Sequence, residues 1–316
     1  MKIILNNILT NYTFKRNNNY KVYKSLDTDS FVKSIAFNGE NQSSFSNFKK
    51  WAKETNFINN IESYTSSNAR VLGRGSEGIV YEISDNQDYV IKQYRRSYLV
   101  PIANTEAKIY KVNDILPELN VGQHIARIEV PNGSQYSTIY HILKRQQGKP
   151  HSVEFAYLNI VNSSTIKIYL DSLKRLSELP QESFNNCVRD VQYITKNGYK
   201  IECDNPHNIL IDYDNSKINF VDIYDKKKDY SNQQGEVLYS LLGAEYPKAF
   251  FTAQKTSIVE KEEARIYSNI IISKYLKAMK SQGIKFDHGQ FFTKLINSHL
   301  FDEVLSLQKL SELNLI

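Results

Sequence analysis

The sequence predicts an α+β protein with a two-lobed fold, in which a small antiparallel β-rich lobe is followed by a larger α-rich lobe. From about residue 68, short runs alternate apolar and polar residues between turns rich in Gly, Asp and Asn, as in an antiparallel meander. From about residue 150, apolar residues recur mostly at helical spacing. We expect an N-terminal extension or small leading module at 1–66, the β-rich lobe at 67–148 and the α-rich lobe at 149–316.

The composition is that of a folded protein. Of 316 residues, 41% are hydrophobic and 12% aromatic, whereas 12 Gly and 7 Pro are too few for a disordered chain. The net charge of +6 is spread out, and short clusters such as Lys226–Lys228 are more typical of solvated faces than of a nucleic-acid site. We therefore expect no nucleic-acid partner.

Cysteine use and hydropathy bear on where the protein works. Cys187 and Cys203 cannot form a disulfide framework and have no metal-ligand spacing with the six histidines, which favours a reducing compartment. The opening MKIILNNILTNYTF does not read as a cleavable signal peptide, and no apolar run is long enough for a membrane span. Export by another route stays open.

The extension and the β-rich lobe contain these expected elements. In the extension, YTFKRNNNYKVYK predicts two strands joined by an Asn turn, and SSFSNFKKWAKETNFINNIESY predicts a helix from its apolar spacing. The runs ARVLGRG, GIVYEIS and DYVIKQY predict the first three strands of the meander. A helix around 101–116, strands at 124–130 and 137–143, and the polar linker QQGKP complete the lobe.

The α-rich lobe is expected to begin with helices at 153–178 and 181–197. A hairpin interrupts it, because NILID and KINFVD flank an Asp-Asn turn. Several helices follow from about residue 233. Within them, Phe250, Phe251 and the run IYSNIIISKYLKAM are expected to lie in the helix core.

Gly73, Gly75 and Gly78 stand in a G-x-G-x-x-G frame between two predicted strands. Glycine allows backbone N–H groups to approach a triphosphate without a Cβ in the way. The same frame fits a tight hairpin that holds no ligand. A Rossmann site would need a helix directly after the glycines, whereas IVYEIS reads as a strand.

Lys92 lies in the next predicted strand, fourteen residues beyond Gly78, where an ammonium can reach the α- and β-phosphates of a nucleotide. Such a lysine needs a carboxylate to hold it, and Glu106, in the expected helix, is the candidate. Singly, the two residues also fit an exposed strand lysine and a solvated helix charge. Their order in a strand-strand-helix setting favours the functional interpretation.

Asn208 and Asp222 lie at the two ends of the predicted hairpin, so pairing of its strands would bring them close together. Mg²⁺ prefers oxygen ligands and keeps several waters, and a carboxylate with an amide is a common protein contribution to its site. Asn and Asp also favour loops in their own right. A magnesium site at Asn208 and Asp222 is the prediction.

In this order, these pieces make the chain resemble the protein kinase-like superfamily over roughly residues 68–240. The matching pieces are GRGSEGIVY for the glycine loop, YVIK, Glu106, NPHNILID for the catalytic loop, and FVDIY for the metal-binding Asp. Within the superfamily, the chain is similar to effector kinases of the NleH and OspG group, which enteric bacteria inject by type III secretion. That group shares a degenerate catalytic loop and a linker like LKRQQGKP.

The chain departs from the family pattern in two places. The family's catalytic Asp, five residues before the loop Asn, corresponds to Cys203, with Asp204 one place later. Either Asp204 is the base or the base is absent. DIYD stands in place of Asp-Phe-Gly and no Ala-Pro-Glu follows, so no phosphorylation-switched activation segment is expected. His207 is expected to be a loop residue.

The resemblance implies an ATP- and Mg²⁺-dependent kinase that phosphorylates Ser or Thr of a host protein. Its catalytic residues would be Lys92, Glu106 and Asp204, with Gly73, Gly75 and Gly78 over the phosphates. It further implies non-Sec secretion into the host cell cytoplasm, bacterial cytoplasm otherwise, and ubiquitin or a host protein as activator. Two alternatives stay open: a pseudokinase scaffold, which Cys203 favours, and a small-molecule phosphotransferase of the aminoglycoside-kinase kind.

Overall fold

The computed structural model describes most of residues 40–291. The described ranges are 40–75, 78–95, 100–101, 106–111, 124–131, 136–151, 161–203, 208–225, 232–285 and 291. The chain divides into two units, 1–38 and 39–316, and all described residues belong to the second. The two strands expected in YTFKRNNNYKVYK lie outside the described residues.

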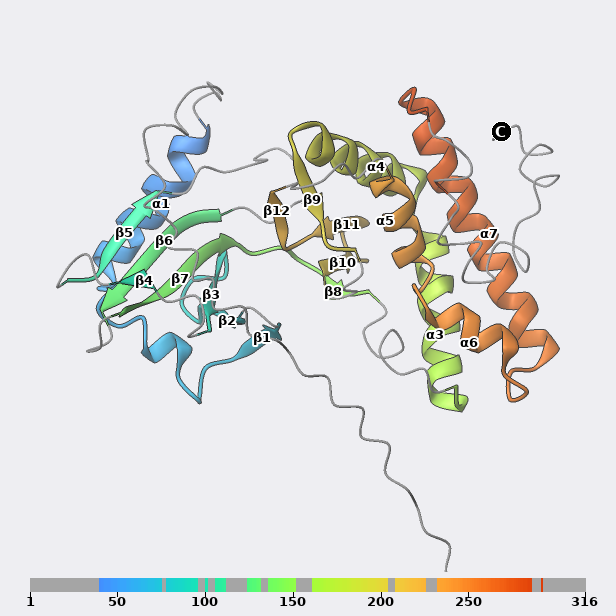
Figure 1. Cartoon of the computed structure of the whole chain (residues 1–316), viewed down its shortest axis with the longest axis horizontal. Coiled ribbons are helices and arrows are strands. Elements are labelled where there is room, and N and C mark those ends of the chain that lie inside the picture. Colours follow the sequence, from blue (N-terminus) through green and yellow to red (C-terminus); the bar gives the residue numbers. More distant parts are fainter. Residues whose placement is uncertain are drawn as a thin grey trace, which may run out of the picture. The chain divides into compact units, whose positions relative to one another are not determined.

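An antiparallel sheet follows α1 in the chain (Figure 1). Its strand order is β1-β2-β3-β7-β6-β5, with the two-residue strand β4 also paired to β7. The bounds are β1 Val71–Arg74, β2 Gly78–Glu82, β3 Tyr89–Tyr94, β4 Val100–Pro101, β5 Lys108–Lys111, β6 His124–Pro131 and β7 Tyr136–Lys144. The strands predicted from alternation are therefore present, since alternating apolar residues give each strand one buried face.

The prediction of a helix around 101–116 is wrong for the part of this stretch that the structure describes. Residues 100–101 and 108–111 are strands, and Glu106 lies in a bend directly before β5. In β5, Ile109 is half-buried between exposed Lys108 and Tyr110. Pairing with β6 therefore decided the conformation of a segment too short to show a clear period.

One face of the sheet is covered by α1 (Glu40–Glu54) and the turns that follow it. The helix predicted over 43–64 is present only as far as Glu54, and turns follow it. Phe48 on the helix and Phe57 and Ile61 in the turns are all fully buried among the sheet residues. We call this group the sheet core. Its buried members are Phe48, Ala52, Phe57, Ile61, Tyr81, Ile83, Ile91, Ile125, Ala126, Ile128, Tyr140 and Ile142.

A second hydrophobic cluster, the helix core, lies among the helices after residue 161. The helices are α3 Ser163–Glu178, α4 Gln181–Lys196, α5 Gln233–Leu241, α6 Tyr246–Thr252 and α7 Ile258–Ser281. Asn162 and Ser257 each cap a helix start with a reciprocal side-chain bond, which fixes where α3 and α7 begin. The helix predicted over 153–178 is wrong at its start: Val161 and Asn162 are not helical and α3 begins at Ser163, while 152–160 lie outside the described residues.

The expectation for the run IYSNIIISKYLKAM is correct only in part. Ile271, Ile272 and Met279 are buried in the helix core, as are Phe250 and Phe251. Ile266 and Ile270, from the same run, are exposed. The run therefore places apolar residues on two faces of α7.

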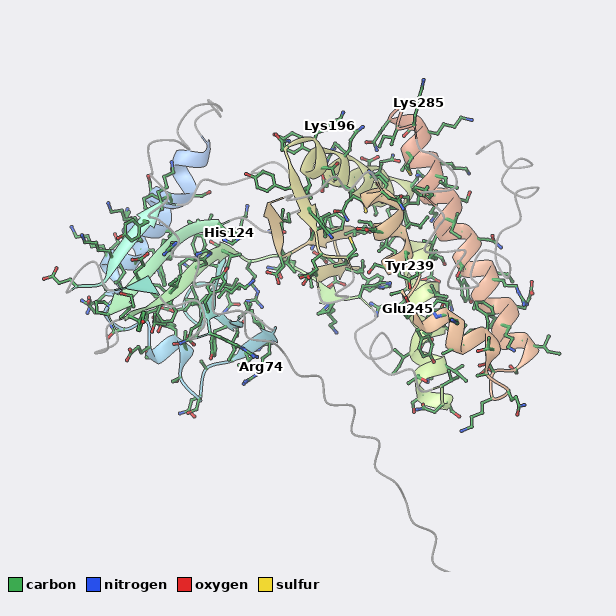
Figure 2. The ribbon with its side chains drawn as sticks, in the orientation of Figure 1. Arg74, His124, Lys196, Tyr239, Glu245 and Lys285 are labelled. Atoms are coloured by element: carbon green, nitrogen blue, oxygen red, sulfur yellow. The ribbon has the colours of Figure 1, made fainter. Side chains whose placement is uncertain are left out.

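The predicted hairpin is present as β10 (Ile209–Asp212) and β11 (Lys217–Phe220), paired antiparallel. Strand β8 (Lys149–Pro150), at the end of the linker QQGKP, pairs with β10. Strand β12 (Ile223–Asp225) pairs with β9 (Tyr199–Ile201). Figure 2 shows the side chains on these elements. In the described part of the chain, we find no helix that is both long and apolar enough to cross a membrane.

Candidate functional site

An ion pair joins the sheet to the end of the hairpin. Lys92 Nζ, on β3, donates a hydrogen bond of 2.6 Å to Asp222 Oδ1, which follows β11. The lysine side chain is 8% exposed, whereas the aspartate side chain is 40% exposed. A buried ammonium requires a partner, and the more accessible carboxylate can at the same time reach a ligand.

Asp222 has an unusual backbone conformation. Its φ is +56°, in the left-handed region that non-glycine residues rarely adopt. Such a conformation costs about 1–2 kcal/mol and persists where the surrounding structure over-determines it, often at ligand sites. Here the Val221 N–H donates to the Asn208 carbonyl at 2.9 Å, and β12 begins directly after Asp222. At Asp222 the chain therefore passes from the sheet that contains β11 to the β9–β12 pair.

Asn208 lies at the other end of the hairpin, where its backbone carbonyl accepts from Val221, the residue before Asp222. Its side chain is buried, and its amide Nδ2 donates to the Glu202 carbonyl at 3.1 Å. This bond orients the side-chain carbonyl oxygen, which is the atom that a hard cation would bind.

Aromatic rings surround Lys92 on its side of the sheet. The ammonium lies 5.4 Å from the centroid of the Tyr94 ring, within cation–π range. His141, on β7, is the ladder partner of Lys92, and its Nδ1 lies 3.5 Å from the Tyr94 hydroxyl. His124, on β6, places its own Nδ1 3.1 Å from that of His141. Figure 2 labels His124 on the sheet.

These two histidines are neutral at physiological pH. Burial lowers the pKa of His124 from 6.5 to about 4; the charge of Lys92 adds to this and that of Asp222 opposes it. Burial lowers the pKa of His141 to about 3, with smaller contributions from His124, Arg127 and Lys92. A neutral pair can share one Nδ1 proton in a hydrogen bond. The histidines therefore add no positive charge beside Lys92.

Glu106 does not have the place predicted for it. It is exposed and, among the described residues, makes no ion pair with Lys92. Asp222 and the Tyr94 ring contact the ammonium instead. The prediction failed because it depended on a helix that this part of the chain does not form.

The predicted glycine loop joins β1 to β2, and the Gly75 N–H donates to the Gly78 carbonyl at 2.9 Å. A Cβ on Gly78 would lie 2.3 Å from the carbonyl oxygen of Gln93, so packing of β2 on β3 alone requires this glycine. A Cβ on Gly73 or Gly75 would meet nothing within 4 Å, and neither has a positive φ. Packing against the described residues does not explain those two glycines.

The linker after β7 is held at both ends. The Arg145 backbone N–H donates to the Asp88 carbonyl at 2.8 Å, and its guanidinium pairs with Glu82 at 2.8 Å. Asn219, on β11, donates to the Gln147 carbonyl at 2.8 Å. The linker therefore bonds to the β2–β3 turn on one side and to the hairpin that precedes Asp222 on the other.

The position expected to supply the base is occupied by a buried thiol. Cys203 is 3% exposed, its thiol faces the Ile201 carbonyl, and the Gln233 amide donates to its sulfur at 3.2 Å. A thiol packed in this way cannot reach a substrate hydroxyl. Asp204 and His207 lie outside the described residues.

Sequence reasoning missed Tyr94, His124, His141 and Arg145. A signal for Tyr94 was present, because residues two apart on a strand share a face and Tyr94 follows Lys92 by two. His141 could be found only from the register of β3 on β7, which alternation does not give.

The chain was also compared with known proteins. No protein-family model matches it, and no curated protein matches it. Within the described ranges, no group of three or more His, Cys, Asp or Glu side chains is arranged to hold a metal ion.

Proposed function

We propose that the protein is an ATP- and Mg²⁺-dependent kinase of the protein kinase-like kind that transfers the γ-phosphate to Ser or Thr of a protein. Lys92 would bind the α- and β-phosphates, and the glycine loop at Gly73 and Gly75 would cover them. Asp222 and Asn208 would hold the metal. The β-rich part would be the N-lobe and the helical part the C-lobe of such a fold.

The observation that carries this proposal is the 2.6 Å contact between Lys92 and Asp222, which are 130 residues apart in the sequence. Both residues belong to the motifs that resemble a kinase, the strand lysine and the hairpin aspartate, and they meet here. A lysine–aspartate pair alone is common in proteins. Two further observations support the proposal: the left-handed backbone at Asp222, and two loop glycines that packing against the described residues does not explain.

The residues present fit a magnesium ion. The half-exposed carboxylate of Asp222 and the amide oxygen of Asn208 are hard oxygen ligands, and Mg²⁺ takes its remaining ligands from water and phosphate. When bound, the metal would neutralise charge on the β- and γ-phosphates. Lys92 is already held by Asp222 and Tyr94, so its ammonium is oriented before a nucleotide arrives.

The biological setting that we propose follows the resemblance to the NleH and OspG group: a bacterial effector delivered into a host cell by a non-Sec route. A bound partner, such as ubiquitin or another host protein, would then replace phosphorylation as the activating signal. These statements rest on the resemblance alone.

The experiment is transfer of radiolabel from γ-labelled ATP to the protein itself and to a generic substrate, with magnesium. Phosphosites are then located by mass spectrometry. Lys92→Ala and Asp222→Ala should each lower transfer by at least 10²-fold, because both remove charge stabilisation from the phosphates. Lys149→Ala, an exposed lysine outside the site, is the control. Unchanged transfer in Lys92→Ala would remove Lys92 from the proposal.

A pseudokinase scaffold is the second candidate, and the burial of Cys203 favours it. The position five residues before Asn208 then supplies no base, and Glu106 does not hold Lys92. Loss of a general base costs about 10²–10⁴-fold in rate. The test is to measure nucleotide binding and phosphate transfer at high protein concentration. The scaffold is favoured if the wild type and Asp222→Ala both bind nucleotide and neither transfers phosphate.

A further inference from the structure

One face of α7 exposes large apolar side chains. Among the described residues, Ile258 is 84% exposed, Val259 69%, Ile266 49% and Ile270 37%. The opposite face of the helix, including Ile271, packs into the helix core against α3 and α4 (Figure 1). A helix that carries apolar residues on two faces usually has partners on both.

The exposed residues form one straight stripe. Val259, Glu263, Ile266, Ile270 and Lys277 follow one another at intervals of four, three, four and seven residues, the spacing of a helix–helix seam. All five are exposed. We call these five residues the α7 stripe.

The charges on the stripe are arranged about Ile270. Glu263 lies seven residues before it and Lys277 seven residues after it, roughly 10 Å along the axis on each side. Among the described residues, neither side chain makes an ion pair or a hydrogen bond. Glu262, beside the stripe, is already paired with Arg265 at 3.2 Å.

We propose that the α7 stripe is the interface of a homodimer, in which α7 of a second copy lies antiparallel to it with the two-fold axis at Ile270. In this arrangement Ile270 meets its own copy, and Glu263 of each chain faces Lys277 of the other. A parallel arrangement would place like charges opposite each other and is disfavoured.

The self-complementary charge pattern is the reason for choosing a second copy over another partner. A two-fold interface requires that each patch be complementary to itself when inverted, and the charges Glu263 and Lys277, seven residues on either side of Ile270, meet this condition. An unrelated partner would impose no such symmetry. This inference stands apart from the proposed kinase activity.

The test is sedimentation velocity on the full chain over roughly 1–100 µM, the range in which a small helix–helix interface would dissociate. We expect a mass that rises with concentration towards twice 36.6 kDa. Ile270→Glu should give a monomer throughout this range. Leu72→Glu is the matched control, because Leu72 is also 37% exposed but lies on β1, and it should leave the mass unchanged.

A charge exchange tests the antiparallel register. Lys277→Glu and Glu263→Lys should each weaken dimerisation about tenfold, since symmetry places two like-charge contacts in each interface. The double variant should have the same dimer dissociation constant as the wild type. A wild-type monomer at all concentrations would overturn the proposal, as would a double variant weaker than either single one. Ile270→Glu that lowers thermal stability without changing the mass would indicate that another segment of the same chain covers the stripe, and would also overturn it.

Discussion

The three loop glycines should respond differently to alanine. Gly78→Ala places a Cβ 2.3 Å from the Gln93 carbonyl oxygen, and 3.3 Å from the Tyr94 Cα. Ordinary contact needs about 3.4–4.0 Å, so β2 and β3 would have to separate by roughly an ångström. Overpacking of this size costs about 1–3 kcal/mol. With an unfolding entropy of about 2.1 cal/mol/K per residue over 316 residues, the melting temperature should fall by about 2–5 °C.

Gly73→Ala and Gly75→Ala are the matched controls, because the new Cβ would meet none of the described residues within 4 Å. They should leave the melting temperature unchanged or raise it slightly, since alanine has fewer unfolded conformations. If the loop covers phosphates, the same two variants should weaken Mg-ATP binding about tenfold, because the Cβ keeps the backbone N–H groups away.

The assay is differential scanning calorimetry of each variant, followed by titration with Mg-ATP. Retained stability in Gly78→Ala would refute the packing argument for that glycine. Wild-type Mg-ATP affinity in both Gly73→Ala and Gly75→Ala would refute the role of the loop in binding phosphate.

Two further predictions concern buried polar groups. Tyr94→Leu should lower kcat/KM for phosphate transfer about tenfold, while Tyr94→Phe, which keeps the ring under Lys92, should stay within about twofold in steady-state kinetics. His151 is buried, its Nε2 bonds to the Leu241 carbonyl, and burial lowers its pKa from 6.5 to about 4. The unfolded chain therefore binds a proton that the folded one does not, so stability should fall as the pH drops from 6.5 towards 4, by about 1.4 kcal/mol per pH unit. Urea unfolding at several pH values gives the free energy of unfolding as a function of pH. This free energy should change less with pH in His151→Asn than in the wild type, and an equal change in both proteins would contradict the prediction.

Much of the fold could be predicted because strand alternation and turn residues are local signals. The strands of the β-rich part, the hairpin that precedes Asp222 and helix α4 all follow from such patterns. The segment around Glu106 failed because a short strand at the edge of a sheet is decided by its neighbour, not by its own sequence. The exposure of Ile266 and Ile270 was missed for a related reason: apolar periodicity marks a buried face without showing what buries it.

The candidate site, too, could be predicted only in part. Lys92, Asn208 and Asp222 were predicted from their order in the chain, and the structure brings Lys92 to Asp222 and Asn208 to the same hairpin end. The contact of Tyr94 with His141 depends on strand register over a separation of 47 residues. No local pattern specifies such a register.

Calorimetric titration with ATP, with and without Mg²⁺, tests the central claim most directly, because it asks only whether Lys92 and Asp222 form a metal–nucleotide site. We predict binding that is tighter with magnesium, weakened about tenfold or more by Lys92→Met, and made independent of magnesium by Asp222→Asn. No binding at millimolar ATP, or binding that neither substitution changes, would contradict the account.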